Sequence, residues 1–456
     1  MKNTRRTFLK NTALAATAAG VPTLLTSARA RGEDANSKPT VVGIGVGGSR
    51  ARYSRGGGIA NQAGRHGQMI AVCDVDQLHN EQFNKRYGGK LKMYTDYRKL
   101  FDEIKPDVVT IGTPDHWHVP IAIRALQAGA HVYCEKPLTL TIEEGFQIRK
   151  AVEKAGRVFQ VGTQQRSENG GKFLKAIAIA KSGRLGKKVN AYVAIGGAPS
   201  GGPFKSTPVP EGLDWDMWLG PAPKADYCEQ RRRMFRWWFD YSGGKMTDWG
   251  AHHIDIAQWA LGQDHSGPVK VSATGQFPSL VPEDLDWRAY LDGKVSLPNG
   301  YNTATQFNIE LTFADGSLMS VNNHYKREKD NVNFGNGILF EGDKGRIFVN
   351  RGKLEGKPID DMNDADRKEI DELVVKLYHG NKPGSHMGNF FHCIETGDQP
   401  VSDVETHVRT MTSCHLCNVA LMLGRELNWD PKREQFVGDA EATALMTRDR
   451  RKGFEM

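Results

Sequence analysis

The chain has little cysteine and no long apolar run. Its 456 residues include six cysteines, too few and too widely spaced for a disulfide framework in a chain of this size. No stretch is long and apolar enough to span a membrane, and there is no internal repeat or low-complexity tract. With 39% hydrophobic residues, the sequence is that of a globular protein long enough for two domains.

A strong charge excess is also lacking once the N-terminus is set aside. The formal net charge is +8, but the first thirty residues contain five basic residues and no acidic one. The rest of the chain is too weakly basic to indicate nucleic acid or an anionic membrane as a partner.

The N-terminal thirty residues have the pattern of a targeting segment. Arg5 and Arg6 precede "FLK", an alanine-rich apolar run follows, and "ARA" at 28–30 offers small residues for cleavage. This pattern resembles a twin-arginine (Tat) export signal. The resemblance implies that residues 1–30 are a signal peptide, that the Tat translocase is a partner during export, and that the mature protein is periplasmic or otherwise exported.

From Thr40 onward, short apolar runs alternate with amphipathic ones. The runs "TVVGIGV", "MIAVCDV", "DVVTIGT", "HVYCEKP" and "VFQVGTQ" are typical of buried parallel strands, and the stretches between them of helices. This alternation predicts an α/β fold whose N-terminal domain, over 31–163, is a doubly wound parallel sheet of the Rossmann type. Residues 164–456 then form a second domain, from which a late helix can pack back on the first.

The first predicted strand runs into a G-x-G-x-x-G pattern. Glycines let the backbone approach a pyrophosphate, and a helix N-terminus stabilises its charge. Asp74 ends the second strand, where a carboxylate accepts ribose hydroxyls and repels a 2′-phosphate, so we expect NAD; Arg50 and Arg52 keep NADP open as an alternative. The expected cofactor residues of this unit are Gly43, Gly45, Val46, Gly48, Ser49, Arg50 and Asp74.

The motif "CHLC" at 414–417 has two interpretations. It could be half of a zinc or redox site, but no second cysteine pair completes a tetrahedral site. It lies in a run with helical periodicity, so we expect Cys414 and Cys417 to be core residues.

Two aspartates and two adjacent histidines lie in "TDWGAHHID". On a helix beginning near Thr247, Asp248, His252 and Asp255 share one face, whereas His253 points about 100° away. One histidine can therefore serve the site. A metal site of Asp248, His252 and Asp255 and an ordinary helix start with a core histidine remain as alternatives, and we expect no metal.

Three motifs together carry a family resemblance. "TPDHWH" (113–118), "EKP" (135–137) and the D-x-x-x-H-x-x-D helix resemble the Gfo/Idh/MocA oxidoreductases, densely over 39–166 and 243–260. The resemblance implies a C-terminal α+β domain with a large, mainly antiparallel open sheet, which in this family often pairs subunits into dimers or tetramers. Alternating stretches around 302–325 and 337–350 are compatible with its hairpins.

The resemblance also implies roles for individual residues. Lys136 and His252 act on the substrate hydroxyl, Asp248 orients them, and the Lys136–Pro137 bond can be cis. The cofactor-facing positions are Thr113, Pro114, His118, Glu135, Lys136 and Gln164, although Asp115 stands where the family usually has asparagine. Substrate contacts are expected from Arg166, Trp238, Tyr241 and Asp255. For the aromatic segment 231–241, which contains Trp238 and Tyr241, core packing is the alternative.

These residues suit alcohol oxidation. An ammonium stabilises a developing alkoxide and a neutral imidazole takes the proton. We therefore expect an exported NAD-dependent oxidoreductase that transfers hydride between a tightly held cofactor and a sugar, polyol or glycoside. A redox-neutral NAD-dependent glycoside hydrolase, which oxidises C3 transiently, is the rival enzyme, and a non-catalytic nucleotide-holding binding protein is the second alternative.

Overall fold

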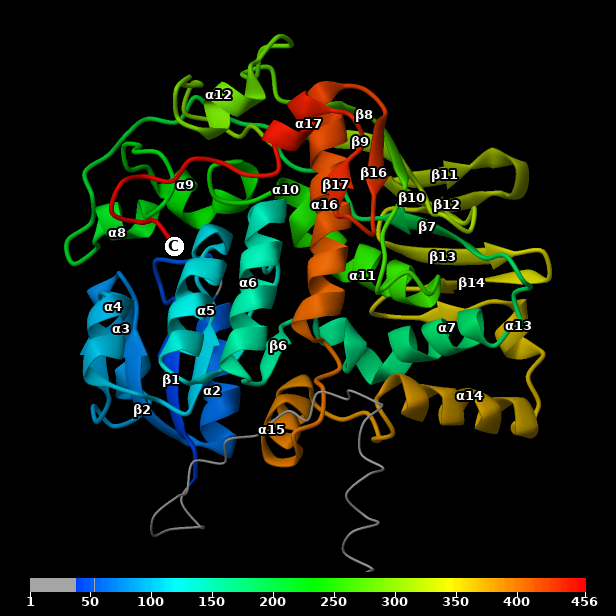
Figure 1. The fold of residues 1–456 in the computed structure, drawn as a ribbon, viewed down its shortest axis with the longest axis horizontal. Helices are drawn as coiled ribbons and strands as arrows, with labels where there is room; N and C mark the ends of the chain where they lie inside the picture. Colours follow the sequence, from blue (N-terminus) through cyan, green and yellow to red (C-terminus); the bar gives the residue numbers. More distant parts are fainter. Residues whose placement is uncertain (1–37, 53) are drawn as a thin grey trace, which may run out of the picture. The chain divides into compact units, whose positions relative to one another are not determined.

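The structure is a computed structural model and describes residues 38–456 except residue 53. This part of the chain forms two large sheets, each with its own helices, and a two-stranded ribbon (Figure 1). Within it, no helix has the length and apolar character that a membrane span needs. The expected signal peptide, 1–30, lies outside the described residues.

The first sheet has six parallel strands in the order β3-β2-β1-β4-β5-β6. The order reverses between β1 and β4, and ligands of such sheets bind beyond the carboxyl ends at this point. Five strands confirm the predicted apolar runs, whereas β3 is a partly exposed edge strand without such a run. The strands are β1 (Thr40–Ile44), β2 (Gln68–Cys73), β3 (Lys92–Tyr94), β4 (Val108–Ile111), β5 (His131–Cys134) and β6 (Phe159–Val161).

Helices cover both faces of this sheet. One core joins the sheet to α5 and α6, and a second joins it to α2 and to Phe390 of the late helix α15 (His386–Thr396). The C-terminal part of the chain thus returns to the first domain. The helices between the strands are α2 (Arg55–His66), α3 (Gln77–Lys85), α4 (Tyr97–Glu103), α5 (His118–Gln127) and α6 (Ile142–Ala155).

The second sheet has nine strands in the order β15-β14-β13-β7-β10-β9-β8-β16-β17. All of its strand pairs are antiparallel except β7 with β10. The hairpins expected around Asp315-Gly316 and within 337–350 are confirmed as β9–β10 and β13–β14. The bounds are β7 (Asn190–Ala194), β8 (Lys270–Gln276), β9 (Gln306–Thr312), β10 (Leu318–Asn322), β13 (Gly337–Gly342), β14 (Gly345–Val349), β15 (Leu354–Glu355), β16 (Leu427–Asp430) and β17 (Gln435–Phe436), with the ribbon β11 (Tyr325–Arg327) and β12 (Val332–Phe334) beside them.

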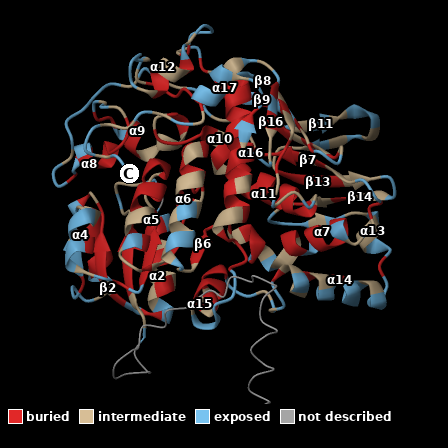
Figure 2. Ribbon diagram, in the orientation of Figure 1, coloured by how far each residue is buried: buried red, intermediate tan, exposed pale blue. Residues whose placement is uncertain are grey.

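Three helices pack on one face of this sheet: α7 (Lys172–Lys181), α11 (Gly250–Ala260) and α16 (Val404–Leu423). All residues of α11 are buried, and Figure 2 shows both α11 and α16 as mostly buried. Cys414 and Cys417 lie in α16 and are fully buried, which confirms them as core residues. The other helices are α8 (Trp215–Leu219), α9 (Glu229–Arg233), α10 (Gly244–Asp248), α12 (Trp287–Leu291), α13 (Lys357–Asp360), α14 (Asp364–Leu377) and α17 (Ala440–Ala444).

Two helix starts differ from the sequence expectation. The helix after β1 begins at Arg55 rather than directly after Gly48, the last glycine of the G-x-G-x-x-G pattern. The predicted helix from Thr247 is divided into α10 and α11 at Trp249. A Cβ on Gly250 would lie 3.4 Å from the sulfur of Cys414, so this glycine lets α11 start close against α16.

Candidate active site

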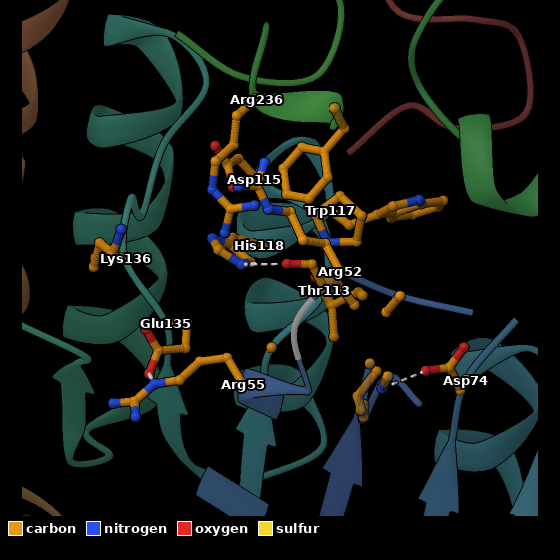
Figure 3. A pocket seen from close by; sticks show the side chains of 18 of the residues that line it. Arg52, Arg55, Asp74, Thr113, Asp115, Trp117, His118, Glu135, Lys136 and Arg236 are labelled. Carbon is orange, nitrogen blue, oxygen red and sulfur yellow. Dashed lines mark hydrogen bonds and ion pairs between the residues drawn. The ribbon is translucent and has the colours of Figure 1, made fainter. Parts of the chain in front are cut away.

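A cavity of about 530 Å³ opens at the carboxyl ends of the first sheet. Its floor is formed by the ends of β1, β2, β4 and β5, and its roof by α9 and the segment around Phe235, with His252 and Arg351 from the second domain. It therefore lies where both the topology and the sequence motifs place a nucleotide. Figure 3 shows the cavity from close by.

Lys136 follows β5 and enters this cavity. Its ammonium donates to Oδ1 of Asp248 at 2.8 Å and to the carbonyl of the same residue at 3.1 Å. Arg236 Nε lies 3.4 Å from the same Oδ1. Burial raises the pKa of Asp248, but the charges of Lys136 and Arg236 outweigh it and hold the pKa well below its usual range. The carboxylate is thus ionised and fixes the lysine.

His252 lies on the first turn of α11 and lines the same cavity. Burial, together with the charge of Lys136, lowers its pKa well below the ordinary value, so the imidazole is neutral. Among the described residues, its Nδ1 has no hydrogen-bond partner. A neutral imidazole beside a fixed ammonium is the pair that proton transfer from a hydroxyl requires.

His253 is directed elsewhere, as the helical spacing predicts. It does not line the cavity; its Nε2 lies 3.2 Å from Oδ1 of Asn336, and its ring packs against Phe173 and Trp249. Burial lowers its pKa to about 4. It is a packed core histidine.

Asp255 and Arg166 were expected at the substrate, but the structure places them together in the interior. They form a two-bonded ion pair with both contacts at 2.7 Å, and they are 1% and 2% exposed. Thr410 of α16 donates to the same carboxylate, and Arg166 stacks on Trp259. Neither residue lines the cavity. The metal alternative loses its ligand set, because Asp248 and Asp255 each pair with a different cation.

Trp238 and Tyr241 also lie outside the cavity. They are 1% and 0% exposed, and both pack in an aromatic cluster on the guanidinium of Arg231. Arg231 donates to the hydroxyl of Tyr241 at 2.9 Å. This is the packing role that the sequence left open for the aromatic segment.

The nucleotide end of the cavity is built from the β1 loop and the end of β2. Asp74 accepts from the backbone N–H of Gly47 at 2.9 Å and of Asp76 at 3.0 Å. A Cβ on Gly45, whose φ is +72°, would lie 2.5 Å from Thr113 Cγ2, and one on Gly56 would lie 1.9 Å from the carbonyl oxygen of Gly45. These glycines therefore let the β1 loop pack closely against Thr113 and the start of α2, the tight glycine packing that is typical of dinucleotide-binding folds. These residues fit NAD.

Other residues expected in the glycine loop do not line the cavity: Gly43, Val46, Gly48, Ser49 and Arg50. Two of them are tied to neighbouring segments. Ser49 is bonded through its backbone N–H and its hydroxyl to Gln82 of α3. Arg50 donates to the carbonyl of Glu211 at 2.9 Å and lies 3.4 Å from Asp76. These contacts hold Ser49 and Arg50 away from the cavity.

The motifs after β4 and β5 meet in the cavity wall. Both ring nitrogens of His118 face backbone carbonyls, Nδ1 that of Pro137 at 2.6 Å and Nε2 that of Thr113 at 3.0 Å. Glu135 accepts from Arg55 at 2.8 Å (Figure 3). It also accepts from Gln164 at 2.9 Å. The Lys136–Pro137 peptide is cis. All of the cofactor-facing positions expected from these motifs line the cavity: Thr113, Pro114, His118, Glu135, Lys136 and Gln164.

Several lining residues were not among the site residues expected from the sequence. Asp115, which replaces the usual asparagine, is buried and accepts from Ser242 at 2.5 Å, and burial raises its pKa. Arg55, Glu168, Arg232, Arg236 and Arg351 also line the cavity. Most of them come from loops or short helices, whose positions no periodicity predicts.

The fold and this site define an NAD-binding oxidoreductase. Residues 40–163 match the oxidoreductase family with an NAD-binding Rossmann fold, and 201–282 and 298–456 match the C-terminal alpha/beta domain of the same family. The chain belongs to the Gfo/Idh/MocA oxidoreductase family, whose dehydrogenases act on CH–OH groups.

Individual relatives are similar over unequal lengths. The chain is 22% identical to D-glucoside 3-dehydrogenase of Escherichia coli K12, over 70% of this chain and 90% of that protein. It is 26% identical to inositol 2-dehydrogenase of Salmonella typhimurium and 35% identical to a glycosyl hydrolase family 109 protein of Shewanella pealeana. These matches span 45% and 34% of this chain and only 49% and 38% of those proteins.

Solved structures share the fold. The WlbA dehydrogenase of Chromobacterium violaceum, solved with NADH and UDP-GlcNAcA, superposes with a TM-score of 0.59 at 17% identity, covering 87% of this chain and 97% of that one. The two proteins thus share the same overall fold.

Proposed function

We propose that this protein is an exported NAD-dependent oxidoreductase that transfers hydride between a tightly held nicotinamide cofactor and a secondary alcohol or ketone of a sugar, polyol or glycoside. The observation that carries the proposal is the ion pair of Lys136 with Asp248 beside the neutral His252 in one cavity. The similarity to a glucoside and an inositol dehydrogenase supports the substrate class.

The geometry of Lys136 suits a substrate oxygen. An ammonium has three N–H donors, and Asp248 takes two of them through its carboxylate and carbonyl. The third is available to a hydroxyl or alkoxide in the cavity, whose developing charge it stabilises. His252 takes the hydroxyl proton in oxidation and returns it in reduction. When bound, the nicotinamide supplies or accepts the hydride.

A segment of the second domain supports retention of the cofactor. Residues 211–218 cross the nucleotide end, where the N–H of Gln77 donates to the carbonyl of Gly212 and that of Asp214 to the carbonyl of Val75. Arg232 adds a buried ion pair with Asp76 at 2.5 Å. A dinucleotide beneath this segment leaves only when the interdomain contacts break, so it behaves as a prosthetic group.

The export proposal rests on the N-terminal sequence, Arg5-Arg6 followed by an apolar run and "ARA". The Tat route carries folded proteins, so a cofactor bound in the cytoplasm can travel with the chain. Retention matters after export, because free nicotinamide cofactor is scarce outside the cytoplasm. An arginine pair changed to lysines (R5K/R6K) should leave the protein in the cytoplasm, as cell fractionation would measure.

A redox-neutral glycoside hydrolase is the second candidate. It is favoured by the 35% identity to a glycosyl hydrolase family 109 protein. In this reaction the substrate alcohol is oxidised, the acidified neighbouring C–H loses its proton, the glycoside is eliminated, and the hydride returns after water addition. The same Lys136 and His252 serve both reactions, so the site alone does not select between them.

One experiment tests the proposal and separates the candidates. The purified mature protein is denatured and the released dinucleotide is identified. The native holoenzyme is then assayed on free sugars and polyols with a redox dye, and on chromogenic glycosides without one. Dye reduction supports the dehydrogenase, and dye-independent chromophore release supports the hydrolase. Absence of bound dinucleotide, or of both activities, would reject the proposal and leave a non-catalytic binding protein.

A further inference from the structure

One cation of the cavity, Arg351, forms no ion pair with any acid among the residues that the structure describes. Arg351 lies between β14 and β15, in a turn where the side chain of Asn350 accepts from the N–H groups of Gly352 and Lys353. Its guanidinium lies over the ring of Trp249 at 4.6 Å, next to Asp248 in the chain. The hairpin therefore carries a cation from the second sheet to the catalytic end of the cavity, where His252 and Lys136 also line the wall.

The guanidinium is held in a fixed orientation. When the Gln165 amide is placed so that both of its groups are satisfied, its oxygen accepts from Nε of Arg351 and its nitrogen donates to the carbonyl of His252, both at 3.2 Å. Trp249 covers one face of the same group. Within 38–456, the terminal Nη atoms of Arg351 make no hydrogen bond or ion pair. A planar guanidinium whose Nε is held and whose Nη atoms are unbonded can donate two hydrogen bonds to one anionic group.

The charges of the surrounding residues also favour an anionic ligand. Lys245 lies 5.9 Å over the ring of Trp249 and forms no ion pair with any described acid. Seven cationic and four acidic side chains line the cavity as a whole. Near the catalytic end, Glu135 is paired with Arg55 and Asp115 accepts a hydrogen bond from Ser242, while Glu168 is exposed. Gly45 and Gly47 of the glycine loop, beside which the pyrophosphate of NAD would bind, also line the cavity, but they follow β1, whereas Arg351 comes from the second sheet.

We infer that the substrate carries an anionic group, a carboxylate or a phosphate, which binds the Nη atoms of Arg351 while the reacting hydroxyl faces Lys136 and His252. This assigns the substrate class as sugar acids or sugar phosphates and makes Arg351 a specificity-determining residue. The inference deepens the proposed function and rests on it. The planar guanidinium on an aromatic ring favours the equally planar carboxylate, and hence an aldonate or uronate.

The test compares matched sugars on the holoenzyme. Glucose, glucuronate, gluconate and glucose 6-phosphate are each assayed with a redox dye that reoxidises the bound cofactor, and their binding is measured by calorimetry. We expect at least one acid to exceed glucose about tenfold or more in kcat/KM. In Arg351→Gln the ratio of kcat/KM for the acid to kcat/KM for glucose should fall about tenfold or more, through a rise in KM for the acid. Arg351→Lys should retain only part of the preference for the acid over glucose, because a lysine lacks the planar guanidinium.

The chain offers a matched control. Lys353 lies two residues further on the same hairpin, pairs with Glu355 and does not line the cavity. Lys353→Gln removes the same charge and should leave the preference intact. A preference for glucuronate or gluconate indicates that the site binds a carboxylate, whereas a preference for glucose 6-phosphate indicates that it binds a phosphate.

The two proposals fail in distinguishable ways. Turnover of glucose with no preference for either anion, or equal loss in the Arg351 and Lys353 variants, overturns the anion site but keeps the oxidoreductase. Arg351-dependent binding of an acid by calorimetry, without reduction of bound NAD by any compound, overturns the oxidoreductase and keeps the anion site.

Discussion

Lys136 and Asp248 lie 112 residues apart in the chain and on different domains, yet a 2.8 Å ion pair joins them at the cavity wall. The pair couples the position of the second domain to the first, because Lys136 follows a strand of one sheet and Asp248 ends a helix that precedes α11. It also orients the ammonium, so that the catalytic pair forms only when both domains are in place.

The first prediction concerns this ammonium. Lys136→Met should lower kcat by about 10²–10⁴-fold, because the alkoxide loses its stabilising charge while the side chain keeps a similar volume. The measurement is reduction of bound NAD at saturating substrate, with a thermal melt to confirm folding. Lys175→Met, at an exposed lysine of α7, is the control and should retain activity. A fully active Lys136→Met protein would falsify the proposed mechanism.

The second prediction is loss of stability at mildly acidic pH. Burial lowers the pKa of His386 and His407 to about 4 and of His116 and His415 to about 3. In the unfolded chain these groups protonate near pH 6.5, so the unfolded state binds more protons below that pH and the free energy of unfolding falls. Each group contributes at most about 1.4 kcal/mol per pH unit between the two pKa values. Stability is fully retained above pH 6.5.

Calorimetric melting between pH 7.5 and 5 checks this dependence. The Tm should fall steadily below pH 6.5, and His415→Asn should reduce the slope. His265 is exposed, so His265→Gln should not alter the slope. A Tm that stays constant or rises toward pH 5 contradicts the prediction.

The sequence predicted the parts of the site that follow regular elements. Strand ends are visible in apolar runs, so Asp74 and Lys136 could be placed at one edge of a sheet before the structure was known. The i, i+4 spacing placed Asp248 and His252 on one face. Asp248 does bond Lys136 and His252 lines the same cavity as Lys136, although the helix breaks at Trp249 between them. Sequence patterns are informative over one strand or a few helical turns. The strand ends near Asp74 and Lys136 and the spacing of Asp248 and His252 lie within that range.

The rest depended on contacts between distant segments. Spacing on α11 gave Asp255 the same face as His252, but only the fold shows that Arg166 lies opposite it. Arg351 lies at a hairpin turn and Arg232 in a five-residue helix, where neither period nor motif marks a functional residue. The glycine pattern at 43–48 predicted the helix start too early, because α2 begins at Arg55 and it is Gly56, in its first turn, that packs on Gly45.

The third prediction concerns cofactor choice. Asp74→Ser should weaken NAD binding about ten- to a hundredfold, because the ribose loses a charged acceptor, and should improve NADP binding by removing the repulsion of the 2′-phosphate. Exchange of radiolabelled dinucleotides into the apoprotein measures both. Asp102→Ser, an exposed carboxylate of α4, is the control for the charge change. An unchanged ratio of NAD to NADP binding places the adenosine ribose elsewhere.

The last prediction distinguishes a structural from a substrate role for Asp255. Asp255→Asn leaves the guanidinium of Arg166, 2% exposed, without its counter-charge, so the free energy of unfolding should fall by about 3–5 kcal/mol. Replacing both partners by apolar residues, Arg166→Met with Asp255→Leu, should recover most of that loss, because no buried charge is then left unpaired. Urea unfolding measures the three proteins, and KM is determined at a temperature where each is folded. If the role of Asp255 is structural, KM in Asp255→Asn should stay within about twofold of the parent value, because the carboxylate does not line the cavity. A twofold change corresponds to less than the roughly 1.4 kcal/mol that a tenfold effect requires. A large rise in KM without loss of stability would instead return Asp255 to the substrate, as the helical spacing had indicated.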